Sequence, residues 1–197
     1  MNRLSTAMIT SKLSHEFTIN MYTKKPKINE DGDMVFEKTR LLLFSGIFLV
    51  LIFSLCAIFM DYYVTEIIEE NGINSNMTDI LYICGYSLTV LFVLIGIKLI
   101  IMFFKYKIIL SKDKITSKKM FSTRTIKLSD IETIIFSNFK GLVFKGDNSK
   151  IAFGNFTAGL VEILKFIDKN IPKHKSETAL VKGKKMLKNN GIIVIFE

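Results

Sequence analysis

The chain has 197 residues, enough for one ordinary domain or two small units. Apolar residues make up 49% of it and are concentrated in two long runs, and the formal net charge is +9. Two cysteines, Cys56 and Cys84, and two histidines, His15 and His174, are too widely spaced for a disulfide framework or a zinc site. We therefore expect a membrane protein that binds no metal ion and no cofactor.

The N-terminal region, residues 1–39, is mostly polar. Phe17, Ile19 and Met21 alternate with polar side chains, which predicts a short strand, and Met34 to Phe36 predicts a second one. Two interpretations stay open: these segments pair with strands later in the chain, or they form a flexible leader.

Residues 40–104 are expected to form a transmembrane hairpin. The run 41–60 contains no charged residue, and the run 80–104 contains only Lys98. A helix needs roughly 20 apolar residues to cross the hydrocarbon layer, so each run predicts one span. Lys98 either extends its side chain to the lipid headgroups or lines a polar path through the membrane.

The charges around the two spans predict their orientation. The loop between them, residues 61–79, contains five acidic residues and no Lys or Arg, whereas lysines precede the first span and follow the second. The positive-inside rule then places both termini in the cytoplasm and the acidic loop outside. The 40 residues up to the first run are too many for the charged start of a cleaved signal peptide, so we expect a multi-pass protein of the cell membrane.

After Phe104 the continuous apolar pattern gives way to short alternating segments separated by turn residues, which predicts strands. About six are expected, at residues 106–110, 115–117, 123–128, 131–137, 142–144 and 151–153. A helix over residues 157–170 closes this region, because its apolar residues recur at helical spacing, and Thr157 is its expected N-cap.

The stretches YKIILSKDKITSKK, TIKLSDIETI and GLVFKGDNSKIAFGN, followed by the closing helix, resemble the bacterial pleckstrin-homology-like (PH-like) domains of small membrane proteins. The resemblance covers residues 105–171, and the preceding hairpin fits the same type of protein. It implies an α+β membrane protein, in which a two-helix transmembrane hairpin carries a small antiparallel β-barrel or sandwich closed by a C-terminal helix.

The part of the chain from Lys105 onward is strongly basic, with 19 Lys and Arg against eight Asp and Glu, a net charge of +11. Such a surface is attracted to anionic lipid. The resemblance implies a mouth that binds headgroups or a partner near the first strand turns, and six basic residues lie there. They are Lys112, Lys114, Lys118, Lys119, Arg124 and Lys127. The alternative is that these residues only determine topology and form a solvated basic face.

The last segment, residues 172–197, is a basic extension. Residues 176–189 predict a short Lys-rich helix, and residues 192–196, IIVIF, predict a strand. This strand needs a cover, which is a sheet edge of this chain, a sheet edge of a second copy in a homo-oligomer or another partner, or the bilayer.

The sequence contains no Ser nucleophile elbow, no Gly-rich phosphate loop and no Cys paired with a His, so we do not expect an enzyme. No nucleic-acid-binding motif accompanies the basic charge. We expect an adaptor that recognises lipid headgroups or a protein partner. The alternative is an accessory or regulatory subunit of a membrane transporter or channel complex, whose helices make close contacts through small residues. These are Ser45, Gly46, Gly85, Ser87 and Thr89.

Overall fold

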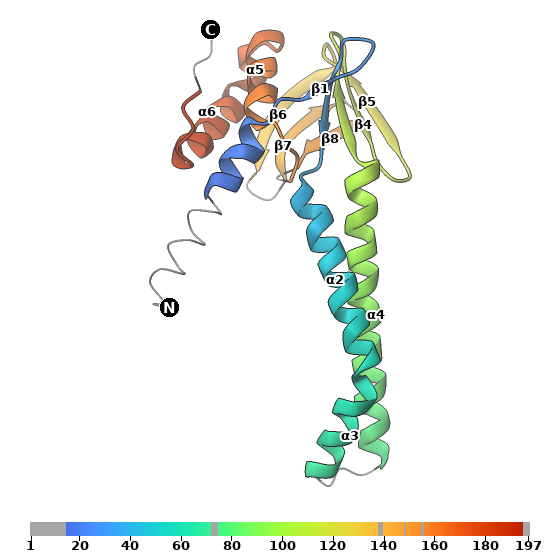
Figure 1. Ribbon diagram of the computed structural model, residues 1–197. Coiled ribbons are helices and arrows are strands. Elements are labelled where there is room, and N and C mark those ends of the chain that lie inside the picture. The colour runs from blue at the N-terminus through green and yellow to red at the C-terminus, as the bar shows by residue number, and fades with distance from the viewer. Residues whose placement is uncertain (1–14, 72–74, 138–139, 148, 155, 195–197) are drawn as a thin grey trace. The chain divides into compact units, whose positions relative to one another are not determined.

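The computed structural model describes residues 15–71, 75–137, 140–147, 149–154 and 156–194 (Figure 1). The chain divides into two compact units. Unit 1 comprises residues 1–39 and 105–197, and unit 2 comprises Arg40 to Phe104. The N-terminal region and the basic extension thus belong to the same unit as the strands.

Unit 2 is a helical hairpin of α2 (Arg40–Ile58), α3 (Met60–Asn71) and α4 (Ser75–Lys105). The segments Arg40–Ile58 and Met77–Lys105 are long and apolar enough to span a membrane. The acidic connection expected over residues 61–79 is largely helical, because its described residues lie in α3 and at the start of α4. Acidic side chains indicate exposure to water, but Glu is also a good helix former.

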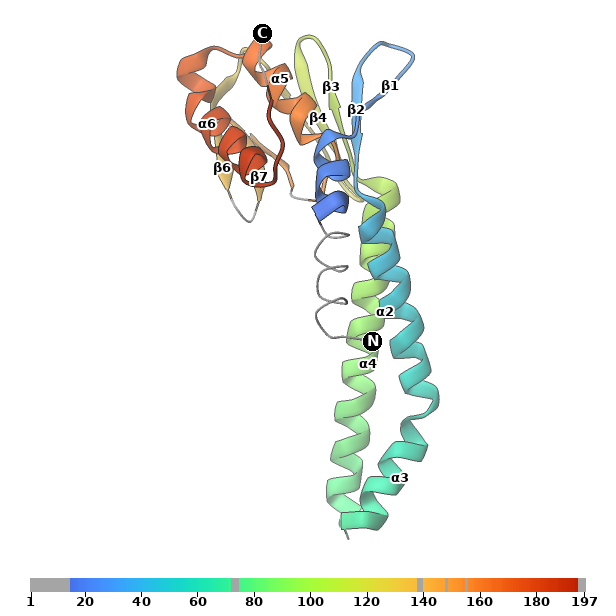
Figure 2. The ribbon, with the colours of Figure 1, turned by 60° about the vertical axis from the view of Figure 1, so that its left-hand side comes forward.

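In unit 2, α2 and α4 lie side by side in both views (Figures 1 and 2). The rings of Phe53 and Phe92 stack between them with centroids 4.3 Å apart. Gly46 and Gly96 also meet, so that the two helix backbones are in close contact. At the far end of the hairpin, the Tyr86 hydroxyl donates a hydrogen bond of 3.2 Å to the Asp61 carboxylate.

Unit 1 contains an antiparallel five-stranded sheet in the order β1 to β5. Its strands are β1 (Lys27–Ile28), β2 (Met34–Glu37), β3 (Lys107–Leu110), β4 (Lys114–Lys118) and β5 (Thr123–Lys127). The predicted strand at Met34 to Phe36 is confirmed, and it pairs with β3, with Glu37 opposite Lys107. Along the chain, the whole of unit 2 therefore lies between β2 and β3, which are neighbouring strands of one sheet.

A second antiparallel sheet contains β6 (Ile131–Ser137), β7 (Gly141–Gly146) and β8 (Ser149–Phe153) in that order. The six strands expected after Phe104 are thus confirmed as β3 to β8. The Tyr106 hydroxyl joins the two sheets by donating a 2.6 Å hydrogen bond to the carbonyl oxygen of Ala152. The α+β class with two antiparallel sheets is as expected, but the described strands do not close into a hydrogen-bonded barrel.

Helices α5 (Leu160–Asn170) and α6 (Lys173–Asn189) lie side by side in unit 1 (Figure 2). Six apolar residues of α5 are buried in the core, because they share one face of the helix. The prediction that Thr157 is the N-cap of this helix is wrong. Helix α5 starts three residues later, at Leu160, and its N-cap is Gly159, with φ of 92°. This left-handed conformation suits glycine, and it leaves Thr157 free for a different contact.

The N-terminal segment also departs from one prediction. Residues 15–23 are helical, so the strand expected at Phe17 to Met21 is wrong. Phe17 and Met21 are four residues apart, which puts them on one face of a helix as well as on one face of a strand. The contacts decide between the two, because Tyr22 is buried in the core and the Met21 carbonyl accepts a 2.9 Å hydrogen bond from the Gly159 amide.

The predicted C-terminal helix is confirmed as α6, which begins three residues earlier, at Lys173. Gly183 packs closely on Leu164 of α5. The strand expected at residues 192–196 is not found in its described part, because Ile192 to Val194 are not in a strand. Ile192 and Val194 instead pack against the core of unit 1, while residues 195 and 196 lie outside the described residues.

Candidate functional site

The six basic residues singled out from the sequence are all exposed on the β3–β4–β5 part of the five-stranded sheet. Among the described residues, none of their side-chain nitrogens lies within 4.0 Å of a carboxylate oxygen. Unpaired cations on a surface remain available to an external anion.

The structure does not bring the six together, because they lie at opposite ends of β4. Lys114 pairs with Lys127, and Lys112 lies in the adjoining β3–β4 turn. At the other end Lys118 pairs with Thr123, and Ser117 pairs with Arg124. A strand rises about 3.3 Å per residue, so the two ends of β4 are about 13 Å apart. We name Lys112, Lys114 and Lys127 the turn group, and Lys118, Lys119 and Arg124 the tip group.

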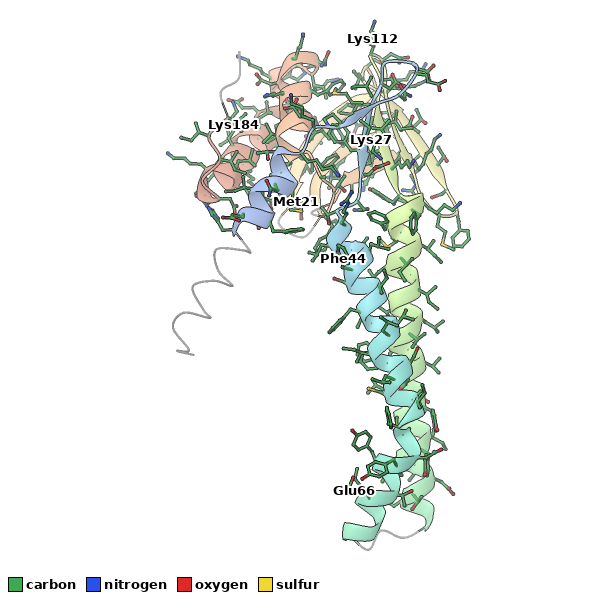
Figure 3. The ribbon with its side chains drawn as sticks, in the orientation of Figure 1. Met21, Lys27, Phe44, Glu66, Lys112 and Lys184 are labelled. Atoms are coloured by element: carbon green, nitrogen blue, oxygen red, sulfur yellow. The ribbon has the colours of Figure 1, made fainter. Side chains whose placement is uncertain are left out.

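Two residues of the turn group line a cleft of about 590 Å³ between the β1–β2 turn, the β3–β4 turn and the end of α5. Figure 3 shows Lys112 projecting outward from its turn. The same cleft is lined by three acidic residues, Asp31, Asp33 and Asp113. Because lysines and carboxylates are mixed there, the cleft suits a partner that carries both charges better than a single phosphate.

The tip group surrounds the β4–β5 turn, which differs from the cleft in composition. Phe121 is 88% exposed and Met120 is 45% exposed. The Lys119 amide donates a 2.8 Å hydrogen bond to the Ser122 carbonyl, so the turn has a defined conformation. From Lys114 to Lys127 the chain contains no acidic residue. The tip therefore combines exposed apolar side chains with uncompensated positive charge.

Lys38 is not singled out by the sequence, in which it is one of several lysines before the first span. Its side chain is buried, and its Nζ donates a 3.1 Å hydrogen bond to the Thr157 hydroxyl. The same Nζ lies 4.2 Å from the centre of the Tyr106 ring. Burial, with a smaller contribution from the positive charge of Lys119, lowers the pKa of Lys38 to about 8.

These contacts give Lys38 a structural role. It lies next to β2, it forms an isolated bridge with Thr157, and Thr39 donates a 2.9 Å hydrogen bond to the Phe156 carbonyl. The N-terminal segment is thereby attached to the loop before α5. No local pattern in the sequence reveals this, since Thr157 is 119 residues away from Lys38.

The remaining candidate residues lie apart from these surfaces. Cys56 and Cys84 are free and exposed on the helices of unit 2, and Lys98 is exposed on α4. Within the described part of the chain, no three His, Cys, Asp or Glu side chains are grouped so that they could hold a metal ion.

Comparison of the chain with protein-family models, with curated proteins and with solved structures found no match.

Proposed function

We propose that this chain is a multi-pass protein of the cell membrane that presents unit 1 to the cytoplasm as a non-catalytic, PH-like binding module for lipid headgroups or a protein partner. The observation that carries the proposal is the insertion of the apolar hairpin between β2 and β3. Two neighbouring strands continue into the two membrane helices, so unit 1 is held at the bilayer by both of them.

The surface of α2 and α4 supports the membrane part of the proposal. In α2, only Leu42 and Gly46 are buried. Large apolar side chains such as Phe48 in α2 and Leu94 in α4 are more than half exposed. An exposed apolar surface that covers two long helices is unfavourable in water and favourable in lipid. The acidic residues of α3 and the lysines that follow α4 support cytoplasmic termini through the positive-inside rule.

The binding part rests on the basic residues of the five-stranded sheet, which have no carboxylate partner among the described residues. The two antiparallel sheets with α5 packed against them support the PH-like assignment. Adaptor domains of this kind use a rigid scaffold and recognise their partners through surface turns.

The anchor and its orientation are tested by cysteine labelling of the full chain, after Cys56→Ser and Cys84→Ser. Single cysteines are placed at Glu66 in α3 and at the exposed Lys150 in β8. We expect a membrane-impermeant maleimide to label position 66 in intact cells and position 150 only after permeabilisation. The reverse pattern contradicts the orientation, and release of the chain by alkaline carbonate contradicts the anchor.

Partner recognition is tested by charge reversal in the full chain. The variant K112E/K118E/K119E should lose cross-linked or co-purified partners, whereas K140E/K150E/K169E, with the same charge change on exposed lysines elsewhere in unit 1, should retain them. Equal capture by both variants and the unmodified chain would count against the proposal.

The packing within the hairpin favours this function over an accessory subunit. Gly46 contacts Gly96, Gly85 contacts Met60, and Thr89 is buried, so three of the five small residues expected to contact a partner are used within unit 2. An accessory subunit requires that residues 40–104 alone co-purify with the transporter or channel. We expect this fragment to capture no such partner.

A further inference from the structure

The β4–β5 tip presents the most exposed large apolar side chain among the described residues, Phe121, at 88%. The turn is held by the hydrogen bond from Lys119 to Ser122 and by the pairing of Lys118 with Thr123. Nothing in the described part of unit 1 covers this aromatic ring, although the turn that carries it is well formed. Such an exposed apolar side chain is typical of a surface that contacts a membrane or another molecule.

The charges beside the ring select the kind of partner. Lys118, Lys119 and Arg124 flank it, and the nearest acidic residues in the sequence, Asp113 and Asp130, lie outside the β4–β5 hairpin. A partner that accepts an apolar ring and several cations together has an apolar layer beneath a negatively charged surface. An anionic lipid bilayer has this composition, since aromatic rings are favoured at the headgroup level and basic residues are attracted to acidic lipids.

The strand register places the tip at the end of the sheet from which the chain leaves for the hairpin. Lys118 pairs with Lys107, and Lys107 pairs with Glu37. These two partners are within two residues of Lys105 and Thr39, the residues at which unit 1 meets unit 2 in the chain. Phe156, which is 50% exposed, lies at the same end, because its carbonyl accepts the hydrogen bond from Thr39.

We propose that the β4–β5 tip inserts into the cytoplasmic face of the bilayer that holds the hairpin, with Phe121 and Met120 at headgroup depth and the tip group on lipid phosphates. The inference rests on the proposed membrane anchor. Because the chain itself keeps the tip next to the membrane, binding is intramolecular and needs no high affinity of the free tip. The tip then acts as a second attachment that limits the orientations of unit 1.

The absence of tryptophan from the chain allows a direct test. Three single-tryptophan variants of the full chain are reconstituted into vesicles of phosphatidylcholine and phosphatidylglycerol in equal amounts: F121W at the tip, L94W in α4 and I28W in β1. Ile28 is the matched control, because it is 63% exposed and lies at the opposite end of the same sheet, paired with Met34. Quenching of each tryptophan by brominated phosphatidylcholine reports contact with lipid.

We expect quenching of F121W, with a blue shift of its emission, quenching of L94W, and no quenching of I28W. If L94W is quenched and F121W is not, the tip does not insert, while the membrane anchor stands. If L94W is not quenched, the anchor itself fails. A blue shift of F121W without quenching means that a protein surface covers the ring, and equal quenching of F121W and I28W means unspecific adsorption; either result overturns the inference.

The contribution of charge is measured in the F121W background. The variant K118E/K119E/R124E should lose most of the F121W quenching, whereas K112E/K114E/K127E, which reverses the turn group, should keep it. Replacing phosphatidylglycerol by phosphatidylcholine should reproduce the loss without any substitution. Equal loss in the two charge-reversal variants would contradict a specific role of the tip group.

Discussion

Gly46 of α2 and Gly96 of α4 pack against each other reciprocally. A Cβ atom added to either residue would lie 2.8 Å from the carbonyl oxygen of the other. The space between the helices therefore admits no side chain at either position, and the backbone on the opposite side cannot move away as a side chain can.

We expect Gly96→Ala and Gly46→Ala to loosen the hairpin. The added methyl group collides with backbone, so the cost should resemble overpacking of a core, about 1–3 kcal/mol. Thermal denaturation of the full chain in detergent, with a fluorophore pair on α2 and α4, measures the change.

Gly85→Ala is the matched control for this prediction. A Cβ at Gly85 would also lie 2.8 Å from its neighbour, but that neighbour is the flexible Met60 side chain. We expect a smaller effect, since the Met60 thioether can adopt another rotamer. Equal destabilisation by all three substitutions would contradict the importance of the Gly46–Gly96 contact.

Because Lys38 is buried, the stability of unit 1 should vary with pH in the alkaline range. Its pKa is about 8 in the folded chain, below its usual value of 10.5, so the unfolded chain binds this proton more tightly. Below about pH 8 both states are protonated and the buried charge opposes folding, and the free energy of unfolding should rise as the pH increases from about 8 toward 10. Each unit of pKa difference corresponds to about 1.4 kcal/mol.

Lys38→Met should remove this rise. The measurement is chemical denaturation of both proteins from about pH 7 to pH 9.5. The difference between the two proteins isolates Lys38, because every other titrating group is shared. Parallel stability curves for the two proteins would show that Lys38 keeps its usual pKa.

Because of Glu37, the stability of unit 1 should also vary with pH in the acidic range. Its carboxylate lies 2.8 Å from the Lys27 ammonium and 3.7 Å from that of Lys107. Partial burial raises the pKa of Glu37, but the hydrogen bond to Lys27 and the charges of Lys27 and Lys107 outweigh it and lower the pKa below its usual value. The stabilisation is therefore present at neutral pH and is lost as the pH falls through the lowered pKa.

Glu37→Gln should reduce the free energy of unfolding at neutral pH by about 0.5–1 kcal/mol, the range of partly exposed ion pairs. At a pH below the folded pKa of Glu37, the two proteins should have the same stability. Urea denaturation at the two pH values measures both effects. A difference that persists in acid would indicate lost packing rather than lost charge.

The N-terminal segment should be required for unit 1 to fold. Phe36 is 1% exposed, and its ring packs edge-on against Phe153 with centroids 5.2 Å apart. Phe36→Ala should cost about 3–5 kcal/mol, as large-to-small changes at aromatic core positions do. Fluorescence-detected denaturation of the full chain provides the measurement.

A fragment of residues 105–197 extends this prediction, since it lacks β2 and leaves the edge of β3 unpaired. We expect it to aggregate or to remain poorly ordered, while a chain in which a short linker joins residues 1–39 to residues 105–197 folds. Dispersed amide spectra from the fragment alone would contradict the prediction.

The local patterns of the sequence were sufficient for the two apolar helices and for strands β3 to β8. A long apolar run has few alternatives to a helix, and alternation such as that of Ile108 and Leu110 specifies which face of a strand is buried. The candidate basic residues were also visible, because charge is a property of composition.

Contacts between residues far apart in the sequence could not be predicted from local patterns. Phe17 and Met21 fit a strand and a helix equally well, and only the packing of Tyr22 in the core decides for the helix. Likewise, the sequence shows Lys38 only as one of several lysines before the first span. The pairing of β2 with β3 places it beside Thr157 and Tyr106. The division of the six basic residues into two groups follows from the strand register, which depends on which side chains are buried together.

The sequence by itself thus determined the elements and the distribution of charge along the chain, because these depend on neighbouring residues. Only the tertiary structure decided that the hairpin is inserted between β2 and β3, that Gly46 faces Gly96, and that the tip group lies at the end of the sheet nearest the hairpin connections. Each of these relationships joins residues about 50 or more positions apart, or follows from a strand pairing that does. Burial and hydrogen bonding between such residues leave no local pattern in the sequence.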